Sequence, residues 1–197
     1  MGTITRTLAN NLTTSLGTSA MTLISSVNSE VDVAEIDFAL DNTTYDHYRI
    51  VFDQFLQETD DTHLRLYCSV NNGSSYDTTS SNYSWVNSGV SGSSGPYSEH
   101  NDQATGYMAF TKGNPGNTSS EGMGFILDVI PNKSGLSNTR GNYFIMTGYR
   151  EDTGTNYRGF QGHGRYMNSG NDVDKIRLQM SSGDITSYTY SFYGFKA

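Results

Sequence analysis

The side chains best suited to binding a partner are concentrated in one stretch of the sequence, residues 154–172, GTNYRGFQGHGRYMNSGND. Tyrosine and arginine are the residues that most often anchor interfaces, and glycines let a partner approach the backbone closely. Aromatic faces also suit sugar rings, because they offer an apolar plane beside hydrogen-bonding edges. The candidate contacts for a partner or a glycan in this stretch are Tyr157, Arg158, Phe160, His163, Arg165 and Tyr166.

A twisted β-hairpin explains the same stretch equally well, with glycines that form bulges and aromatic residues that belong to the core. Trp85, the only tryptophan of the chain, is a further candidate contact. It lies within residues 71–102, where we expect a short strand around Trp85 flanked by long surface loops, because Ser, Gly and Asn dominate the segment. A core or loop anchor is favoured for Trp85 over a platform for a ligand.

Side chains that could catalyse a reaction form no recognisable motif. The chain has no Gly-x-Ser-x-Gly, His-Glu-x-x-His or Gly-Lys-Ser sequence, and its four histidines are dispersed. A glycosidase needs two carboxylates about 5 to 10 Å apart. The acids that could supply such a pair are Asp53, Glu58, Asp60, Asp61, Asp128, Glu151 and Asp152. No pair among them stands out, so we expect a protein without enzymatic activity and name no catalytic residue.

Three acidic loops, residues 41–42, 58–62 and 171–174, could offer oxygen ligands to calcium. None of them has the spacing of an EF-hand, and Asx turns are the favoured explanation for their composition. We therefore predict no metal site and no cofactor.

The composition favours a β protein that does not bind nucleic acid. The chain has 197 residues, which suits one domain, and its 14 Tyr and 9 Phe favour strands. A formal net charge of −8 opposes binding to DNA or RNA, since that binding depends on Lys and Arg. The single cysteine, Cys68, cannot form an intrachain disulfide and is expected in the core. No export leader and no transmembrane run is visible, so we expect no membrane insertion.

Apolar runs of strand length recur between turn-forming clusters. In residues 64–70, 122–130 and 175–180 apolar and polar side chains alternate, which is typical of strands with one buried face. The expected strands are residues 21–27, 34–40, 48–55, 64–70, 82–86, 106–110, 122–130, 142–149, 175–180 and 188–195. No helix separates them, so the sequence predicts an all-β fold, an antiparallel, jelly-roll-like β-sandwich.

The domain organisation expected from this pattern is one sandwich domain, residues 21–197, preceded by an N-terminal arm, residues 1–20. The arm is rich in Thr, Ser and Asn, which are poor helix formers, and we interpret it as mainly extended. It could order against a neighbouring subunit. A strand that simply belongs to the sandwich is an equally good interpretation.

Three stretches of the chain carry a resemblance to a known class of proteins. They are residues 21–55, with a turn that carries Tyr45 and Tyr48, residues 62–78, with an Asn-Gly-Ser turn, and residues 172–197, which end on YGFK. In pattern they resemble small β-sandwich virion proteins of tailed bacteriophages, especially marine ones. The three stretches cover a little under half of the chain, and none contains catalytic residues.

The resemblance implies a virion structural protein on the particle surface, made in the host cytoplasm, of the head decoration, head fibre or tail fibre kind. The expected partners are further copies of the chain, as a homo-oligomer, and other proteins of the capsid or tail. The alternative is a host-recognition module of a tail fibre or head fibre that binds a host-surface glycan, with Tyr157, Phe160, Tyr166 or Trp85 as stacking platforms. A polysaccharide-degrading glycosidase is the third and least favoured function.

Overall fold

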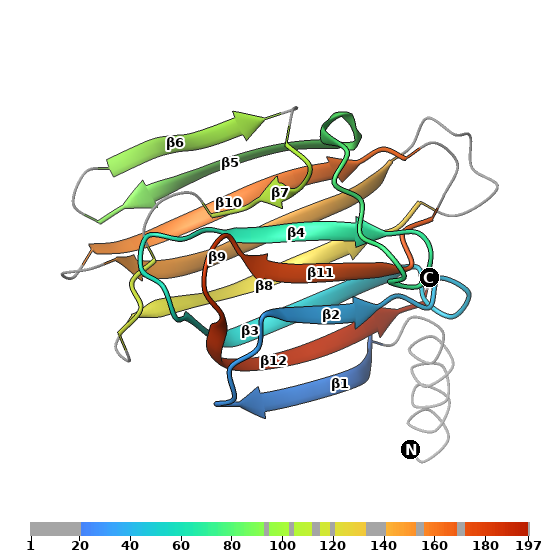
Figure 1. Ribbon diagram of the computed structural model, residues 1–197, viewed down its shortest axis with the longest axis horizontal. Coiled ribbons are helices and arrows are strands. Elements are labelled where there is room, and N and C mark those ends of the chain that lie inside the picture. The colour runs from blue at the N-terminus through green and yellow to red at the C-terminus, as the bar shows by residue number, and fades with distance from the viewer. Residues whose placement is uncertain are drawn as a thin grey trace, which may run out of the picture.

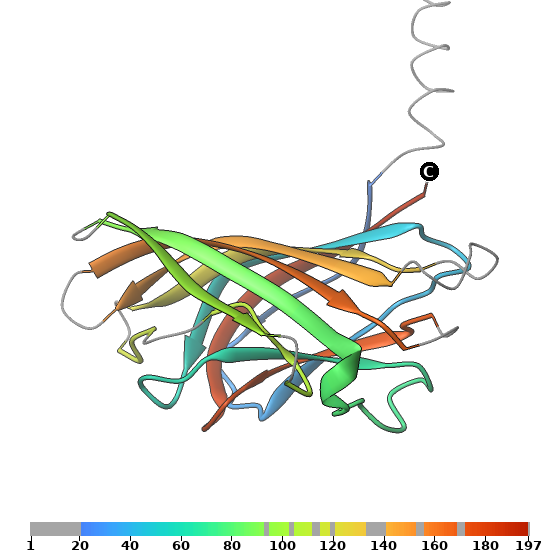
Figure 2. The ribbon, with the colours of Figure 1, turned by 90° about the horizontal axis from the view of Figure 1, so that it is seen from above.

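The computed structural model describes residues 21–92, 95–102, 105–111, 115–118, 121–132, 141–152, 156–168 and 172–196. The predicted arm, residues 1–20, lies outside them. The described residues form two antiparallel sheets packed face to face (Figures 1 and 2), which confirms the all-β sandwich. The strands are divided unequally, eight to four. We refer to the two sheets as the larger sheet and the smaller sheet.

The larger sheet has the order β1-β12-β3-β8-β9-β10-β5-β6. Its strands are β1 (Met21–Ser29), β12 (Ile185–Phe195), β3 (His47–Gln57), β8 (Gly122–Ile130), β9 (Asn142–Asp152), β10 (Asn156–Tyr166), β5 (Tyr83–Ser91) and β6 (Gly95–Asp102). The smaller sheet has the order β2-β11-β4-β7. Its strands are β2 (Glu35–Ala39), β11 (Lys175–Met180), β4 (Leu64–Ser69) and β7 (Met108–Ala109). A short 3-10 turn, η1 (Ser80–Asn82), precedes β5.

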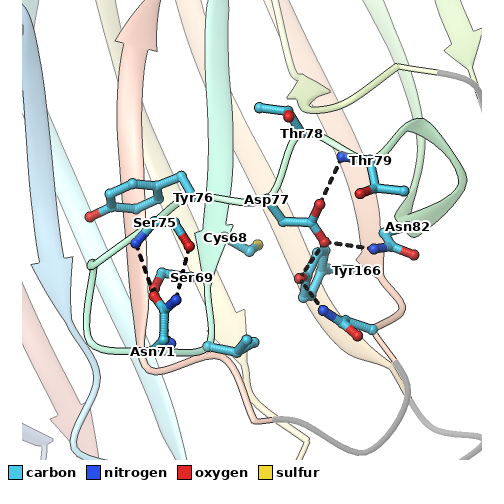
Figure 3. Close-up of a pocket in the computed structure, with 12 residues that line it drawn as sticks. Cys68, Ser69, Asn71, Ser75, Tyr76, Asp77, Thr78, Thr79, Asn82 and Tyr166 are labelled. Atoms are coloured by element: carbon cyan, nitrogen blue, oxygen red, sulfur yellow. Dashed lines mark hydrogen bonds between the residues drawn. The ribbon is translucent and has the colours of Figure 1, made fainter.

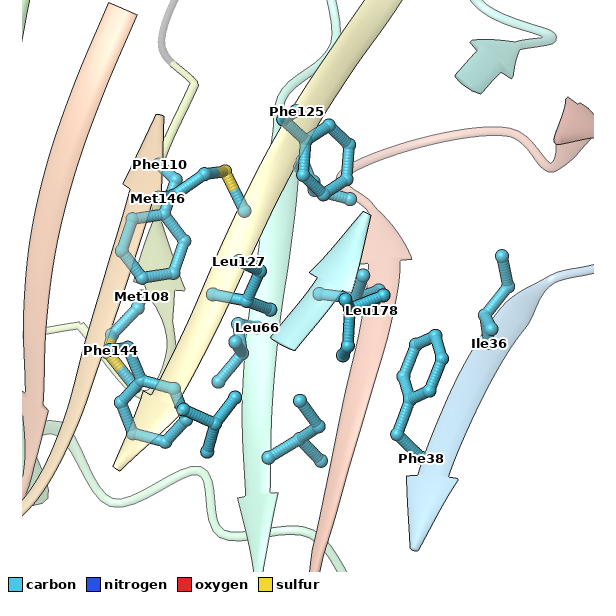
Figure 4. Close-up of a cluster of buried hydrophobic side chains, with 14 of the residues drawn as sticks. Ile36, Phe38, Leu66, Met108, Phe110, Phe125, Leu127, Phe144, Met146 and Leu178 are labelled. Atoms are coloured by element: carbon cyan, nitrogen blue, oxygen red, sulfur yellow. The ribbon is translucent and has the colours of Figure 1, made fainter. Parts of the chain in front are cut away.

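The core lies between the two sheets and follows the alternation seen in the sequence. Leu66 of β4 and Leu178 of β11 contribute from the smaller sheet, while Leu127 of β8 and Phe144 of β9 contribute from the larger sheet (Figure 4). Burying a side chain of this size stabilises the fold by about 1.5–3 kcal/mol. Cys68 is a buried free thiol in β4, as expected. One hydrophobic cluster therefore holds both sheets together.

Aromatic rings fill the half of the core beneath β3 and β12. Phe52 stacks on Phe125 with 4.6 Å between ring centroids, and Phe38 of β2 meets Phe192 edge-on at 5.2 Å. Such pairs are each worth about 0.5–1.5 kcal/mol beyond the burial of their area. Phe38 also meets Phe52 edge-on at 6.2 Å, so its ring connects β2 of the smaller sheet to β3 and β12 of the larger sheet.

The structure corrects the sequence interpretation at two places and decides between its two alternatives at a third. Residues 71–102 contain two paired strands, β5 and β6, instead of one short strand between long loops. Residues 156–166, interpreted either as partner-binding loop or as β structure, form β10, which pairs with β9 on one side and β5 on the other. The strand expected over residues 106–110 is reduced to the two residues of β7. All ten expected strands have a counterpart, β6 was not predicted, and β10 agrees with the β-hairpin alternative for its segment.

Candidate interaction surface

Three of the seven candidate contacts are buried, which corrects their assignment as contacts. Phe160 and Tyr166 project from β10 toward the smaller sheet, and Trp85 projects inward from β5. The indole Nε1 of Trp85 donates to Thr105 Oγ1 at 3.0 Å, so the polar edge of this ring is satisfied inside the protein. The core interpretation is the correct one for these three rings, because side chains on alternate positions of a strand share one face.

The other four candidates lie at or near the surface. Tyr157 is 56% exposed and His163 is also exposed, because odd-numbered positions of β10 face away from the smaller sheet. Arg165 is half-buried on the same side, with its guanidinium carbon 5.8 Å from the centroid of the Tyr143 ring. Arg158 is half-buried and is the register partner of the fully buried Arg150. Of the candidates, only Tyr157, His163 and Arg165 therefore face outward.

The outward side of the larger sheet carries more exposed apolar side chains than the candidate list contained. We define the outer face as the outward side of β8, β9, β10 and β5. Its exposed large apolar residues are Ile126, Ile130, Tyr143, Tyr149, Tyr157, Val86 and Val90. These four strands are consecutive in the sheet, so the residues form one surface. Tyr143 and Tyr149 were missed, although the alternation of residues 142–149 placed both opposite Phe144 and Met146.

Two tyrosines of the outer face form a flat pair at one end of it. The rings of Tyr149 and Tyr157 are 5.7 Å apart between centroids and inclined by 20°. Tyr149 lies across Gly124 of the neighbouring strand, where a Cβ atom would come within 2.7 Å of its ring. Gly159, the register partner of Tyr149, has open space above it. Gly124 thus lets the Tyr149 ring lie against the sheet, and both tyrosine rings remain exposed to solvent.

Asp128, at the other end of the outer face, is paired with side chains of the neighbouring strand β3. Arg49 of β3 donates to both carboxylate oxygens of Asp128, through Nε at 2.7 Å and Nη2 at 2.8 Å. His47 Nε2 lies 3.2 Å from the same carboxylate. The hydrogen bond to Asp128 raises the pKa of Arg49, despite partial burial. Asp128, one of the acids considered for catalysis, is therefore held in a bidentate ion pair.

A polar pocket of about 360 Å³ lies at one end of the sandwich, between the end of β4, the loop that follows it and the end of β10 (Figure 3). Its described lining consists of Cys68, Ser69, Val70, Asn71, Ser75, Tyr76, Asp77, Thr78, Thr79, Asn82, Tyr166 and Asn168. Asp77 is the only carboxylate in this set. A pair of acids of the glycosidase kind is thus not assembled by the described residues around the pocket.

Asp77 organises the hydrogen bonds of the pocket. Its Oδ1 accepts from the backbone N–H of Thr79 at 2.7 Å, and its Oδ2 accepts from Asn82 Nδ2 at 2.6 Å and from the Tyr166 hydroxyl at 2.8 Å. We call these contacts the Asp77 network. The Tyr83 hydroxyl donates to the backbone carbonyl of Asp77 and accepts from the N–H of Cys68. Both carboxylate oxygens are engaged, so the network holds the loop between β4 and β5 in place.

The pKa of Asp77 reflects this arrangement. Burial acts to raise it, but the hydrogen bonds from Thr79, Asn82 and Tyr166 outweigh burial and bring it below its ordinary value. Burial also raises the pKa of Tyr166 and that of Tyr83. Asp77 therefore stays ionised and accepts hydrogen bonds, while both phenols stay protonated at neutral pH.

One of the three acidic loops considered for calcium forms an Asx turn. Asp41 accepts from the hydroxyls of Thr43 and Thr44 and from their backbone N–H groups. These hydrogen bonds, led by the one from the Thr43 side chain, lower the pKa of Asp41 to about 2. Within the part of the chain that the structure describes, no three His, Cys, Asp or Glu side chains gather in a way that could hold a metal ion. Within the same residues no helix is long and apolar enough to cross a membrane.

Comparison with known proteins gives no relative. No family model matches the chain, and no significant match was found among curated proteins or among solved structures.

Proposed function

We propose that this chain is a structural protein of the bacteriophage particle surface, of the head decoration, head fibre or tail fibre kind, that acts through protein–protein contacts without catalysis. The observation that carries the proposal is the outer face, where apolar side chains are exposed on four adjacent strands. Soluble monomers rarely expose broad apolar patches, and such patches mark contact surfaces. The partners are other capsid or tail proteins and further copies of the chain.

The strands formed by the three resembling stretches also support the proposal, because they lie together in the fold. Residues 21–55, 62–78 and 172–197, which resemble phage virion proteins, contain β1, β2, most of β3, β4, β11 and β12. These strands are one side of the larger sheet and three of the four strands of the smaller sheet. The stretch without a resemblance supplies β5 to β10, which include the four strands of the outer face. The chain thus combines a scaffold half with a half suited to specific contacts.

Incorporation into particles tests the proposal. In the phage that encodes this chain, Val90→Asp places a charge on the outer face and should lower the number of copies per purified particle at least several-fold, because a buried unpaired charge opposes docking. Val31→Asp is the matched control, since Val31 is also exposed but lies in the loop after β1. Quantitative mass spectrometry of purified particles gives the copy number. Absence of the wild-type chain from the particles would refute the proposal.

A second candidate function, binding of a host-surface glycan, is favoured by the flat pair of Tyr149 and Tyr157. Sugar rings stack on such aromatic faces. On a glycan array, Tyr149→Ala and Tyr157→Ala should abolish saturable binding, whereas Tyr143→Ala, on the same strand as Tyr149 but at the other end of the outer face, should retain it. No binding by the wild-type chain at millimolar sugar would remove this candidate.

A further inference from the structure

The polar pocket at the end of β4 has no role in the functions proposed above. Tyr166, which ends β10, lines the pocket, whereas Tyr157 lies near the start of the same strand, about 30 Å away, and faces the other side of the sheet. The pocket volume of about 360 Å³ falls within the range of about 300–1,000 Å³ that is usual for small-ligand sites. The pocket is therefore a candidate site in its own right.

Figure 3 shows two groups of hydrogen-bonded side chains on either side of Cys68, and they form two walls of the pocket. In one wall, Asn71 Oδ1 accepts from the Ser69 hydroxyl and from the backbone N–H of Ser75, both at 3.0 Å, and Asn71 Nδ2 donates to Ser75 Oγ at 2.8 Å. The other wall is the Asp77 network. Both walls are held by hydrogen bonds within the protein, so few side chains have to be ordered when a ligand binds.

Both walls retain hydrogen-bonding positions that the protein does not use. Within the part of the chain that the structure describes, Asn71 donates through one of its two side-chain N–H groups. Asn82 and Asn168 each donate through Nδ2, and among the described residues no hydrogen bond reaches their Oδ1 atoms. The lining thus offers donors and acceptors side by side. A ligand hydroxyl, which donates one hydrogen bond and accepts others, matches both.

The charge of the pocket disfavours ionic ligands. Asp77 is the only charged side chain of the described lining, and its lowered pKa keeps it ionised at neutral pH. An anion would approach this carboxylate with no Lys or Arg in the described lining to compensate. Both carboxylate oxygens already accept hydrogen bonds within the Asp77 network, so a cation would have to displace those donors. An uncharged ligand avoids both costs.

We propose that this pocket binds a neutral, hydroxyl-rich ligand of the size of one hexose ring, either a free sugar or the terminal unit of a glycan. Asn71 donates to hydroxyls of the ligand, and Asn82 and Asn168 accept from them. Asp77 is a positioning residue, because it holds Asn82 and Tyr166 in place. The site depends neither on the tyrosine pair of the outer face nor on a place in a phage particle.

Ligand-observed NMR on the purified full-length chain tests the class of ligand. The probes are glucose, galactose, mannose and N-acetylglucosamine, each titrated to about 20 mM, and at least one should bind saturably with a dissociation constant in the millimolar range. The uronate and the amino sugar with the same ring stereochemistry carry a charge and should bind at least about tenfold more weakly. No saturable binding of any of these neutral sugars, or equal binding of a charged analogue, would overturn the proposal.

Two substitutions in the lining test the location of binding. Ser75→Ala and Thr78→Val each remove one hydroxyl at an exposed position and should weaken sugar binding about three- to tenfold, as expected for the loss of one hydrogen bond. Ser74→Ala is the matched control, because Ser74 is also exposed but does not line the pocket. Urea denaturation checks that all three variants remain folded. Sugar binding that both lining variants retain in full would overturn the proposal.

Two further comparisons separate this site from the tyrosine pair and identify the source of the sugar. Tyr149→Ala and Tyr157→Ala should leave binding in the pocket unchanged. If these variants lose the sugar while Ser75→Ala and Thr78→Val keep it, binding belongs to the outer face and the proposal fails. An oligosaccharide that ends in the bound sugar should bind at least as tightly as the free sugar if the ligand is the terminal unit of a glycan. A much weaker affinity for the oligosaccharide would assign the pocket to the free sugar.

Discussion

At the scale of single residues, Asp77 has the largest number of hydrogen-bonded partners around the pocket. Three different elements meet at its carboxylate, since Thr79 and Asn82 come from the loop and η1, while Tyr166 ends β10. Hydrogen bonds to a charged group contribute about 1.5–3 kcal/mol, more than those between neutral groups. The Asp77 network thus ties the loop between β4 and β5 to the larger sheet.

Removal of one hydroxyl from this network should destabilise the protein measurably. Tyr166→Phe retains the buried ring but deletes the donor to Asp77, so we expect the free energy of unfolding to fall by about 1–2 kcal/mol. Urea denaturation measures the change. Tyr143→Phe, on an exposed ring of β9, is the matched control and should change stability by less than about 0.5 kcal/mol. Equal effects of the two substitutions would show that the network does not stabilise the fold.

The depressed pKa of Asp77 predicts how stability depends on pH. In the unfolded chain its pKa returns to about 3.9, so the unfolded state takes up the proton first as the pH falls. The contribution of Asp77 is complete above about pH 5 and is lost progressively as the pH falls below 4 toward its folded pKa. Asp77→Asn should be less stable at pH 7 and lose less stability between pH 5 and pH 2 than the wild type. Parallel stability curves for the two proteins would contradict this assignment.

At the scale of elements, β10 shows what the sequence could not reveal. The strands β4, β8 and β11 were predicted because their own apolar residues alternate. Two inward positions of β10 are instead Gly162 and Gly164, and the space beside them is filled by Phe110 and Met108 from the segment around β7. The apolar partner of β10 is therefore supplied from more than 50 residues away. For the same reason the sequence could not show which candidate contacts face outward. Whether Tyr157 and Phe160 point outward or inward depends on this pairing.

Two glycines in neighbouring strands should respond oppositely to the same substitution. A Cβ atom on Gly148 of β9 would meet the Gly124 carbonyl and come within 2.5 Å of Phe125 Cβ, whereas one on Gly159 of β10 would meet nothing within 4 Å. We expect Gly148→Ala to destabilise the protein by about 1–3 kcal/mol through overpacking. Gly159→Ala should be neutral or stabilise it by up to about 1 kcal/mol, since alanine loses less backbone entropy. Thermal unfolding of both variants provides the measurement, and a similar loss in both would contradict the difference in packing.

At the scale of the whole molecule, the shared core predicts that the two sheets unfold together. Each sheet contains a natural reporter, because the only tryptophan, Trp85, is buried in the larger sheet and the only cysteine, Cys68, is buried in the smaller sheet. In urea, the shift of Trp85 fluorescence and the accessibility of the Cys68 thiol to a rapid labelling reagent should follow one transition. Exposure of the thiol at clearly lower urea would mean that the smaller sheet detaches first.

The overall architecture was predictable to the level of an antiparallel sandwich, but the division of strands was not. Local alternation and turn residues such as those of residues 71–75 define single strands and their ends. The order in which strands pair depends on contacts such as β1 with β12, which join residues about 170 positions apart. Nothing in either segment by itself indicates that pairing. The eight-to-four division follows from many such distant contacts.

The pairing of β1 with β12 also determines how the module responds to mechanical force. Met21 and Phe195 are register partners at the same end of this ladder. Tension applied between these two residues would load the hydrogen bonds one pair at a time, as in a zipper, instead of shearing the whole ladder at once. Strands loaded in this way separate at low force. A pull between Met21 and Phe195 would therefore separate β1 from β12 before it strained the rest of the sandwich.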